Sequence, residues 1–188
     1  MAGSLISYFG WEGEIKQSIS WVLLLTVISS FMALPWSVYS TFHIEAKHGF
    51  NKTTPMTFVT DFMKSMVLTF VIAPPIIAAI VYILLHTGPA MAMYLWTFMF
   101  VLSLVMLTIY PILIAPLFNK YTPLEEGSLR TKIEDLASSL SFPLKKLFVV
   151  DGSKRSAHSN AYMYGFFKNR RIVLYDTLIQ QCDEDQVT

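Results

Sequence analysis

The stretch that decides the fold is Ser65–Asn119, SMVLTFVIAPPIIAAIVYILLHTGPAMAMYLWTFMFVLSLVMLTIYPILIAPLFN, which contains no Lys, Arg, Asp or Glu. His86–Pro89 interrupts it and leaves two apolar halves, residues 65–85 and 91–118. A helix rises about 1.5 Å per residue and the hydrocarbon core of a bilayer is roughly 30 Å thick. Each half is therefore long enough to span a membrane as a helix.

A third uncharged run precedes this stretch. Residues 17–44 lack Lys, Arg, Asp and Glu, and their most apolar part, Trp21–Tyr39, predicts a span at about residues 18–40. Two glutamates and one lysine lie just before it, so the basic n-region of a secretory signal peptide is missing. A buried helix of a large soluble protein is the alternative, which uncharged apolar runs of this length disfavour.

The composition of the whole chain agrees with a membrane protein. Hydrophobic residues make up 54% and charged residues 14% of the 188 residues, which is too apolar for an ordinary soluble domain. We predict a mainly α, multi-spanning membrane protein with about three transmembrane helices, followed by the start of a small cytosolic α+β domain. The predicted transmembrane region is 1–118, and the predicted second domain is 119–188.

Lys and Arg predict the orientation. Lys16 is the one such residue before the first span, whereas the loop before the second span and the tail after the third together carry thirteen. The positive-inside rule therefore places the tail on the cytosolic side. The tail's nine acids nearly balance its ten bases, which argues against a nucleic-acid surface and leaves the lipid bilayer as the expected partner.

The tail begins with a helix signal. Thr122, Pro123 and Glu125 suit the N-cap, N1 and N3 positions of a helix that ends before Pro143. One apolar stripe at helical spacing is expected to face a core. It consists of Leu129, Ile133, Leu136 and Leu140.

Strand signals follow the helix. Leu147–Val150, Asn160–Tyr164 and Arg171–Tyr175 are short runs with strand composition or alternation. The polar connection Gly165–Arg170 predicts that the last two strands form a hairpin. A further helix is expected to open at Asp176, with Asp or Thr as its cap.

The residues alone reveal no catalytic constellation. His43 and His48 are five apart, which places them roughly 140° apart around a helix, a poor pair for one metal. His158 is the one histidine of the tail, and a catalytic zinc generally needs three protein ligands. The serines beside it lack the nucleophile elbow, and the single cysteine excludes a multi-cysteine zinc site.

Five blocks of the chain, in family order, resemble the type 1 CAAX prenyl proteases. These blocks are Leu34–Tyr39 (LPWSVY), Glu45–Lys52 (EAKHGFNK), Ile114–Lys120 (IAPLFNK), Val150–Tyr162 (VDGSKRSAHSNAY) and Gly165–Leu178 (GFFKNRRIVLYDTL). The resemblance extends over nearly the whole chain, from about Trp21 to Gln181, and the blocks are too long to match by chance.

The resemblance implies an integral membrane zinc metalloendopeptidase of the endoplasmic reticulum. Members of this family enclose a chamber with membrane helices and remove the last three residues of prenylated proteins that end in C-a-a-X. The prenylated C-terminal peptide is thus the implied substrate. The implied cofactor is zinc, held by the two histidines of HExxH and a later glutamate, while the glutamate of HExxH activates the bound water.

The chain departs from this pattern in one respect. It contains no HExxH and ends at Thr188, before the helix that carries this motif in the family. We therefore expect a truncated chain with no catalytic residue, no metal ligand and no zinc of its own. The alternatives are an incomplete gene product and a short form that acts as a binding partner or regulator.

The resemblance also gives residues 156–165, SAHSNAYMYG, a role that spacing alone does not suggest. It places this segment at the edge of a metallopeptidase cleft, where an extended substrate pairs with a strand through main-chain hydrogen bonds. His158, Asn160, Ala161 and Tyr162 are the expected substrate-binding residues.

Overall fold

The structure is a computed structural model that describes residues 13–165 and 169–187. The described residues form two compact units. The first contains the chain up to Tyr39 together with Phe58–Met106, and the second contains Ser40–Thr57 together with the chain from Leu107 onward. The first unit is helical, whereas the second contains a β-sheet.

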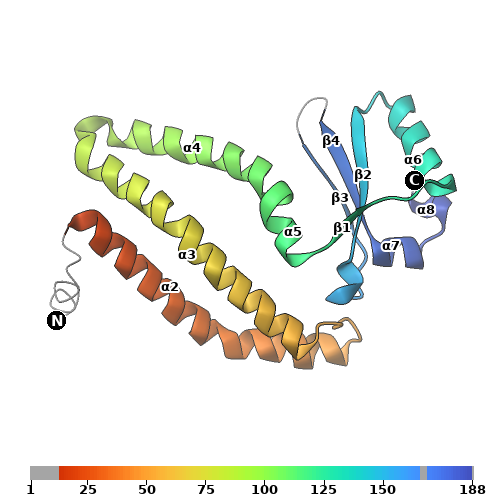
Figure 1. Ribbon diagram of the computed structural model, residues 1–188, viewed down its shortest axis with the longest axis horizontal. Coiled ribbons are helices and arrows are strands. Elements are labelled where there is room, and N and C mark those ends of the chain that lie inside the picture. The colour runs from red at the N-terminus through yellow and green to blue at the C-terminus, as the bar shows by residue number, and fades with distance from the viewer. Residues whose placement is uncertain (1–12, 166–168, 188) are drawn as a thin grey trace. The chain divides into compact units, whose positions relative to one another are not determined.

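Three long helices account for the apolar runs: α2 (Glu14–Tyr39), α3 (Pro55–His86) and α4 (Met91–Ile109), the last preceded by the 3₁₀ turn η2 (Gly88–Ala90) (Figure 1). The helices, with their extensions, are long and apolar enough to cross a membrane over Glu14–Glu45, Pro55–His86 and Gly88–Phe118. None of the three contains a buried residue. Many of their large apolar side chains are exposed, and the length and hydropathy of the helices confirm the prediction of three candidate membrane spans.

Two of these helices pass into π-helical segments. α2 continues as η1 (Ser40–Glu45), and α4 continues as η3 (Tyr110–Ile114), which contains Pro111 and leads into α5 (Ala115–Phe118). π-helical turns inside α-helices are rare and are frequent at functional sites.

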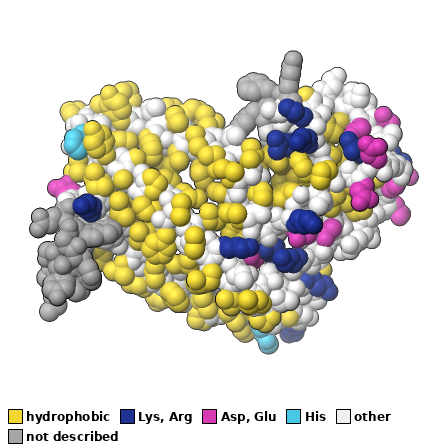
Figure 2. Space-filling model, viewed as in Figure 1, with side chains coloured by type: hydrophobic (Ala, Val, Ile, Leu, Met, Phe, Trp, Pro, Cys, Tyr) yellow, Lys and Arg dark blue, Asp and Glu magenta, His cyan; other side chains and the backbone are white. Residues whose placement is uncertain are grey.

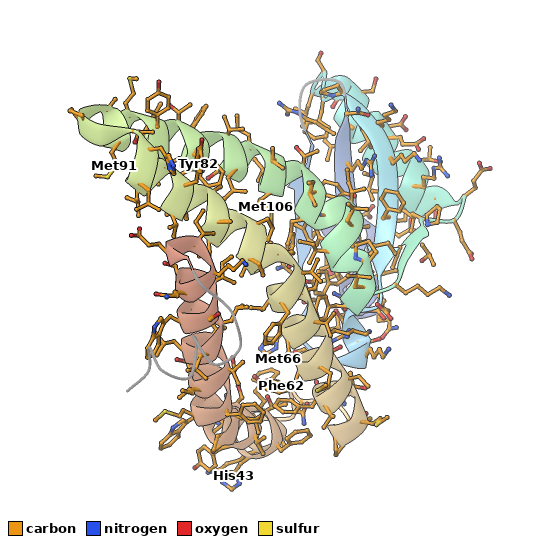
Figure 3. All side chains as sticks on the ribbon, turned by 60° about the vertical axis from the view of Figure 1, so that its left-hand side comes forward. His43, Phe62, Met66, Tyr82, Met91 and Met106 are labelled. Atoms are coloured by element: carbon orange, nitrogen blue, oxygen red, sulfur yellow. The ribbon has the colours of Figure 1, made fainter. Side chains whose placement is uncertain are left out.

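Figure 3 shows Phe62 on the side of α3 that faces α2, where its ring meets the ring of Phe31 with centroids 5.8 Å apart.

The sheet of the second unit has four strands in the order β1-β2-β4-β3. They are β1 (Tyr121–Pro123), β2 (Leu144–Val150), β3 (Ala161–Tyr164) and β4 (Arg170–Tyr175). The β3–β4 pair is antiparallel, which confirms the predicted hairpin, although part of its connection lies outside the described residues. The central pair, β2 and β4, is parallel, and this crossover through η4 (Gly152–Lys154) and β3 was not predicted.

The predicted helix opening at Thr122–Glu125 is wrong. Residues 121–123 form β1, which pairs antiparallel with the end of β2, and the helix α6 begins at Ser128 and ends at Ser139. The Asp151 carboxylate accepts a hydrogen bond from the Lys120 main-chain N–H at 2.6 Å, and this contact directs the chain along β2. Long-range pairing thus overrides a local capping pattern.

The core lies between α6 and one face of the sheet. Ile133 of α6 packs against Leu147 and Leu174, with α7 (Asp176–Gln181) and α8 (Glu184–Val187) at its border. The predicted stripe is therefore correct at its beginning and wrong at its end. Its last two members, Leu136 and Leu140, are 41% and 70% exposed, while Ala137 is buried in their place.

The cap predicted for the helix at Asp176 is also wrong. Tyr175 is the N-cap of α7 and makes no side-chain capping bond. The Asp176 carboxylate instead accepts hydrogen bonds from the main-chain N–H groups of Ser153 and Thr177, at 2.9 and 2.8 Å, and from the Ser153 hydroxyl. This carboxylate therefore joins η4 to the start of α7.

Candidate functional site

Strand β3 lies at an edge of the sheet. The Tyr175 N–H donates to the Asn160 carbonyl at 3.0 Å, so Asn160 faces β4 in a hydrogen-bonded pair. Such pairs alternate along an antiparallel ladder, which directs the main-chain groups of Ala161 and Met163 away from β4. Among the described residues no strand pairs with that outer side, so an extended peptide has a free edge to join.

Asn160 protects this edge locally. Its carboxamide oxygen accepts a hydrogen bond from the Ala161 N–H at 2.8 Å, and both residues are exposed. The contact satisfies one of the two outward N–H donors that a pairing peptide would use. A rotation of the Asn160 side chain is sufficient to free it.

The Tyr162 side chain anchors β3 on the half-buried face of the sheet, opposite the face that carries the side chains of Ala161 and Met163. Its hydroxyl lies 2.8 Å from that of Tyr121 on β1, and its ring meets the ring of Tyr175 edge-on at 6.3 Å. Burial is the main cause that raises the pKa of the Tyr162 phenol far above its usual value, and burial likewise raises the pKa of Tyr121. Both phenols therefore remain neutral hydrogen-bonding groups, and Tyr162 supports the strand from its half-buried face.

His158 is exposed beside the start of β3. Its Nδ1 lies 2.7 Å from the Ser156 hydroxyl, and its ring stacks on Phe50 with centroids 4.1 Å apart. The His158 carbonyl accepts a hydrogen bond from the Thr177 hydroxyl at 2.9 Å. The ring is thus fixed flat against an aromatic partner, with one nitrogen used locally.

The loop between the first two helices forms a clamp on the segment that leads into β3. The Lys52 N–H donates to the Arg155 carbonyl at 3.1 Å, and the Ala157 N–H donates to the Phe50 carbonyl at 2.9 Å. An isolated β-bridge between Asn51 and Ser156 joins the same two segments. Residues 155–158 are therefore positioned by a segment about one hundred positions earlier in the chain.

Arg155 extends the clamp to the end of the third helical run. Its guanidinium donates to the Asn119 side-chain oxygen and to the Phe118 carbonyl, both at 2.6 Å. Neither Phe50 nor Arg155 was predicted as a site residue. Both lie inside the quoted resemblance blocks, which was the one signal in the sequence that marked them.

A metal centre is not formed by the described part of the chain. In residues 13–165 and 169–187, no group of three or more His, Cys, Asp or Glu side chains is arranged to hold a metal ion. His43 lies in η1 (Figure 3), and His86 stacks on Tyr82 with ring centroids 4.2 Å apart. The described donor set does not fit a catalytic zinc, which needs three protein ligands.

Comparisons with known proteins match both parts of the chain. Residues 1–120 match the family described as CAAX prenyl protease N-terminal, five membrane helices, and residues 123–188 match peptidase family M48. The CAAX prenyl protease 1 homolog of Arabidopsis thaliana is 60% identical over 100% of this chain and 45% of its own length. The human homolog is 51% identical over 96% of this chain and 38% of its own.

A solved structure matches the fold as well. The crystal structure of S. mikatae Ste24p is similar with a TM-score of 0.88 and 45% identity, over 91% of this chain and 41% of that one. The chain thus spans less than half the length of the relatives it matches. Since matches of this identity extend from the membrane helices through the sheet, this chain belongs to the CAAX prenyl protease family of M48 metallopeptidases.

Proposed function

We propose that the protein to which this chain belongs is a zinc metalloendopeptidase that removes the last three residues of prenylated C-a-a-X proteins. The observation that carries the proposal is the free edge of β3, with the main-chain groups of Ala161 and Met163 directed outward. The names of its relatives, CAAX prenyl protease 1 homologs, support the substrate class.

The described residues would bind and orient the peptide. Ala161 and Met163 offer main-chain donors and acceptors, Asn160 turns away from the Ala161 N–H to admit the peptide, and Tyr162 anchors the strand. His158, held between Ser156 and Phe50, lies where it would contact residues that flank the paired segment. Together these four predicted residues form a surface for strand addition.

Zinc in this family would lower the pKa of a bound water and polarise the peptide carbonyl. No HExxH occurs in the sequence, and the described residues bring no three ligands together. The part of the reaction assigned to these residues is therefore substrate binding.

We further propose that the protein lies in the endoplasmic reticulum membrane with the second unit on the cytosolic side. The excess of Lys and Arg on one side of the three candidate spans supports this orientation. The family matches to residues 1–120 and 123–188 support a division into a membrane region, 1–118, and a metallopeptidase region, 119–188. Cysteine accessibility at Cys182 in sealed microsomes tests the side, because it is the one cysteine of the chain.

The activity is tested with the complete open reading frame that contains these 188 codons. The purified membrane protein is incubated with a farnesylated peptide ending in C-a-a-X, and release of the tripeptide is followed by mass spectrometry. We expect zinc-dependent release by the complete protein. The expressed 188-residue chain should show neither stoichiometric zinc nor cleavage. Failure of the complete protein to cleave would leave the role of a non-catalytic binding partner.

A further inference from the structure

A pocket of ≈ 280 Å³ adjoins the carboxyl end of β3, within the second unit. Its helix side is formed by the last turn of α4 and by η3, and its strand side by the ends of β3 and β4. The residues that line it are Leu107, Thr108, Pro111 and Ile112 on the helix side and Tyr164, Gly165, Asn169 and Arg171 on the strand side. The volume is just below the range of about 300–1,000 Å³ that is typical of small-ligand sites.

The helix side is mainly apolar, because three of its four residues are Leu107, Pro111 and Ile112. Leu107 and Pro111 are four residues apart and so project from one side of the helix, as do Thr108 and Ile112. Leu107 and Ile112 nevertheless remain 59% and 46% exposed. A mainly apolar wall that the described residues of the second unit leave largely exposed favours an apolar occupant.

The strand side closes the pocket with an aromatic ring. The Arg171 guanidinium lies over the Tyr164 ring, 5.6 Å from its centroid, and donates to its hydroxyl at 3.4 Å. Arg171 is thereby engaged with Tyr164, and no Lys or Arg lines the helix side. An uncharged chain fits this lining better than an anionic headgroup does.

Tyr164 links the pocket to the proposed peptide site, because it is the last residue of β3. A peptide that joins β3 in antiparallel fashion, the more stable arrangement, has its amino-terminal part beside Tyr164 and its carboxyl end beside Asn160. Alternate side chains of that peptide point to the sheet face that carries Tyr162 and Tyr164. The prenylated cysteine precedes the three residues removed, so it lies toward Tyr164.

We propose that this pocket receives the isoprenoid chain of the substrate. The inference rests on the proposed function and adds the subsite that recognises the lipid. The thioether chain would pass from the paired peptide over Tyr164 and lie against Leu107, Pro111 and Ile112. The pocket would then select for long unsaturated hydrocarbon on the cysteine, while β3 binds the main chain irrespective of the lipid.

The first test locates the lipid in the complete wild-type protein. A C-a-a-X peptide whose farnesyl chain carries a photoreactive diazirine is bound and irradiated, and the modified protein residues are identified by mass spectrometry. We expect label on residues 107–112 and on the Tyr164–Arg171 side, suppressed by excess unlabelled farnesyl peptide. Label confined to other helices, or not suppressed by the competitor as for a bulk bilayer lipid, would overturn the pocket.

The second test fills the pocket with Ile112→Trp. The control is Leu113→Trp, the same change at the adjacent position, which is 62% exposed and does not line the pocket. For Ile112→Trp we expect the ratio of kcat/KM for an S-farnesyl peptide to that for its S-butyl counterpart to fall about tenfold or more, and for the control to keep the wild-type ratio. Equal ratios in both variants would refute the pocket.

The two proposals fail in different ways. If the wild-type protein releases no tripeptide from either peptide, the proposed protease function fails. If it releases the tripeptide but neither the label nor the ratio points to the pocket, the function stands and the lipid subsite falls. If Ile112→Trp does not fold, the labelling of the wild-type protein decides alone.

Discussion

The two units of this chain are stabilised by different surroundings. The three long helices contain no buried residue, and the exposed fraction of side chains such as Met32 and Trp36 reaches 71% and 75%. The unit with the sheet instead buries Val150 and Val173 to 2% and 0% exposure. Figure 2 shows hydrophobic side chains over the helices and the charged ones gathered mainly over the sheet unit. The helices therefore depend on lipid, whereas the sheet unit depends on its own core.

The largest expected effect comes from truncating that core. Leu174→Ala removes contacts with Ile133 and Leu147 and is expected to cost the sheet unit about 2–5 kcal/mol in the free energy of unfolding. The readout is the urea dependence of thiol labelling at Cys182, which is half-buried. Leu24→Ala, at a 51% exposed position of α2, is the matched control. If both variants shifted the urea midpoint of Cys182 labelling equally, the proposed difference between the two units would be contradicted.

A charge in the middle of a membrane helix should impair membrane insertion, whereas a charge on the surface of the sheet unit should not. Val71→Arg lies near the centre of α3 at a 65% exposed position and should disfavour membrane insertion by roughly 2.5–3.5 kcal/mol. The measurement is the fraction of chain that resists carbonate extraction. Arg substituted for Met163, which is 66% exposed on β3, should leave insertion unaltered. Normal insertion of Val71→Arg would contradict a lipid-facing α3.

Arg155 tests the clamp between the loop, the third helical run and the sheet. Arg155→Met removes the hydrogen bonds of a charged donor to Asn119 and Phe118 and is expected to destabilise the sheet unit by about 1.5–3 kcal/mol. The urea dependence of Cys182 labelling again measures the change in the free energy of unfolding. Lys154→Met is the control because Lys154 is exposed and adjacent. A loss confined to the control would show that local charge, and not the clamp, matters.

The smallest effect is expected at the tyrosine pair. Tyr121→Phe removes one hydroxyl contact to Tyr162 and should cost about 1 kcal/mol. Because burial raises the pKa of both phenols above the ordinary 10.0, folding favours their neutral forms. The contribution of these two phenols to stability is therefore fully present below pH 10 and is lost as the pH rises beyond it through their raised pKa values. Phenolate absorbance against pH follows the ionisation of the tyrosines, and Cys182 labelling follows unfolding. We expect the variant to lose less stability at alkaline pH than the wild-type protein does.

Sequence reasoning succeeded wherever one local signal dominates. Runs without charge give candidate spans irrespective of the fold, and the spans Pro55–His86 and Gly88–Phe118 contain the predicted halves, although α3 begins ten residues before the first half. It failed at β1, because Thr122-Pro123 satisfies the rules for a helix start while the actual partner, β2, lies more than twenty residues away. It also failed at Leu136 and Leu140, because periodicity shows that a stripe exists but not where the core ends.

The candidate site shows the same division. His158, Asn160, Ala161 and Tyr162 were expected from resemblance, and the structure places them at or beside an edge strand, although their contact with substrate stays a prediction. Phe50 and Arg155 were missed, since no local pattern relates position 50 to position 158. The pocket beside Tyr164 was missed for the same reason, because it joins residues 107–112 to residues more than fifty positions later.

The membrane character, the three candidate spans and the family can be read from the sequence, because each depends on contiguous residues: apolar runs long enough to cross the hydrocarbon core, and unbroken blocks of family resemblance. The place of β3 at an edge of the sheet, the loop that contacts the segment before it and the pocket beside Tyr164 emerge only in the tertiary structure. Those features depend on hydrogen bonds and packing between segments far apart in the chain, which sequence spacing does not encode.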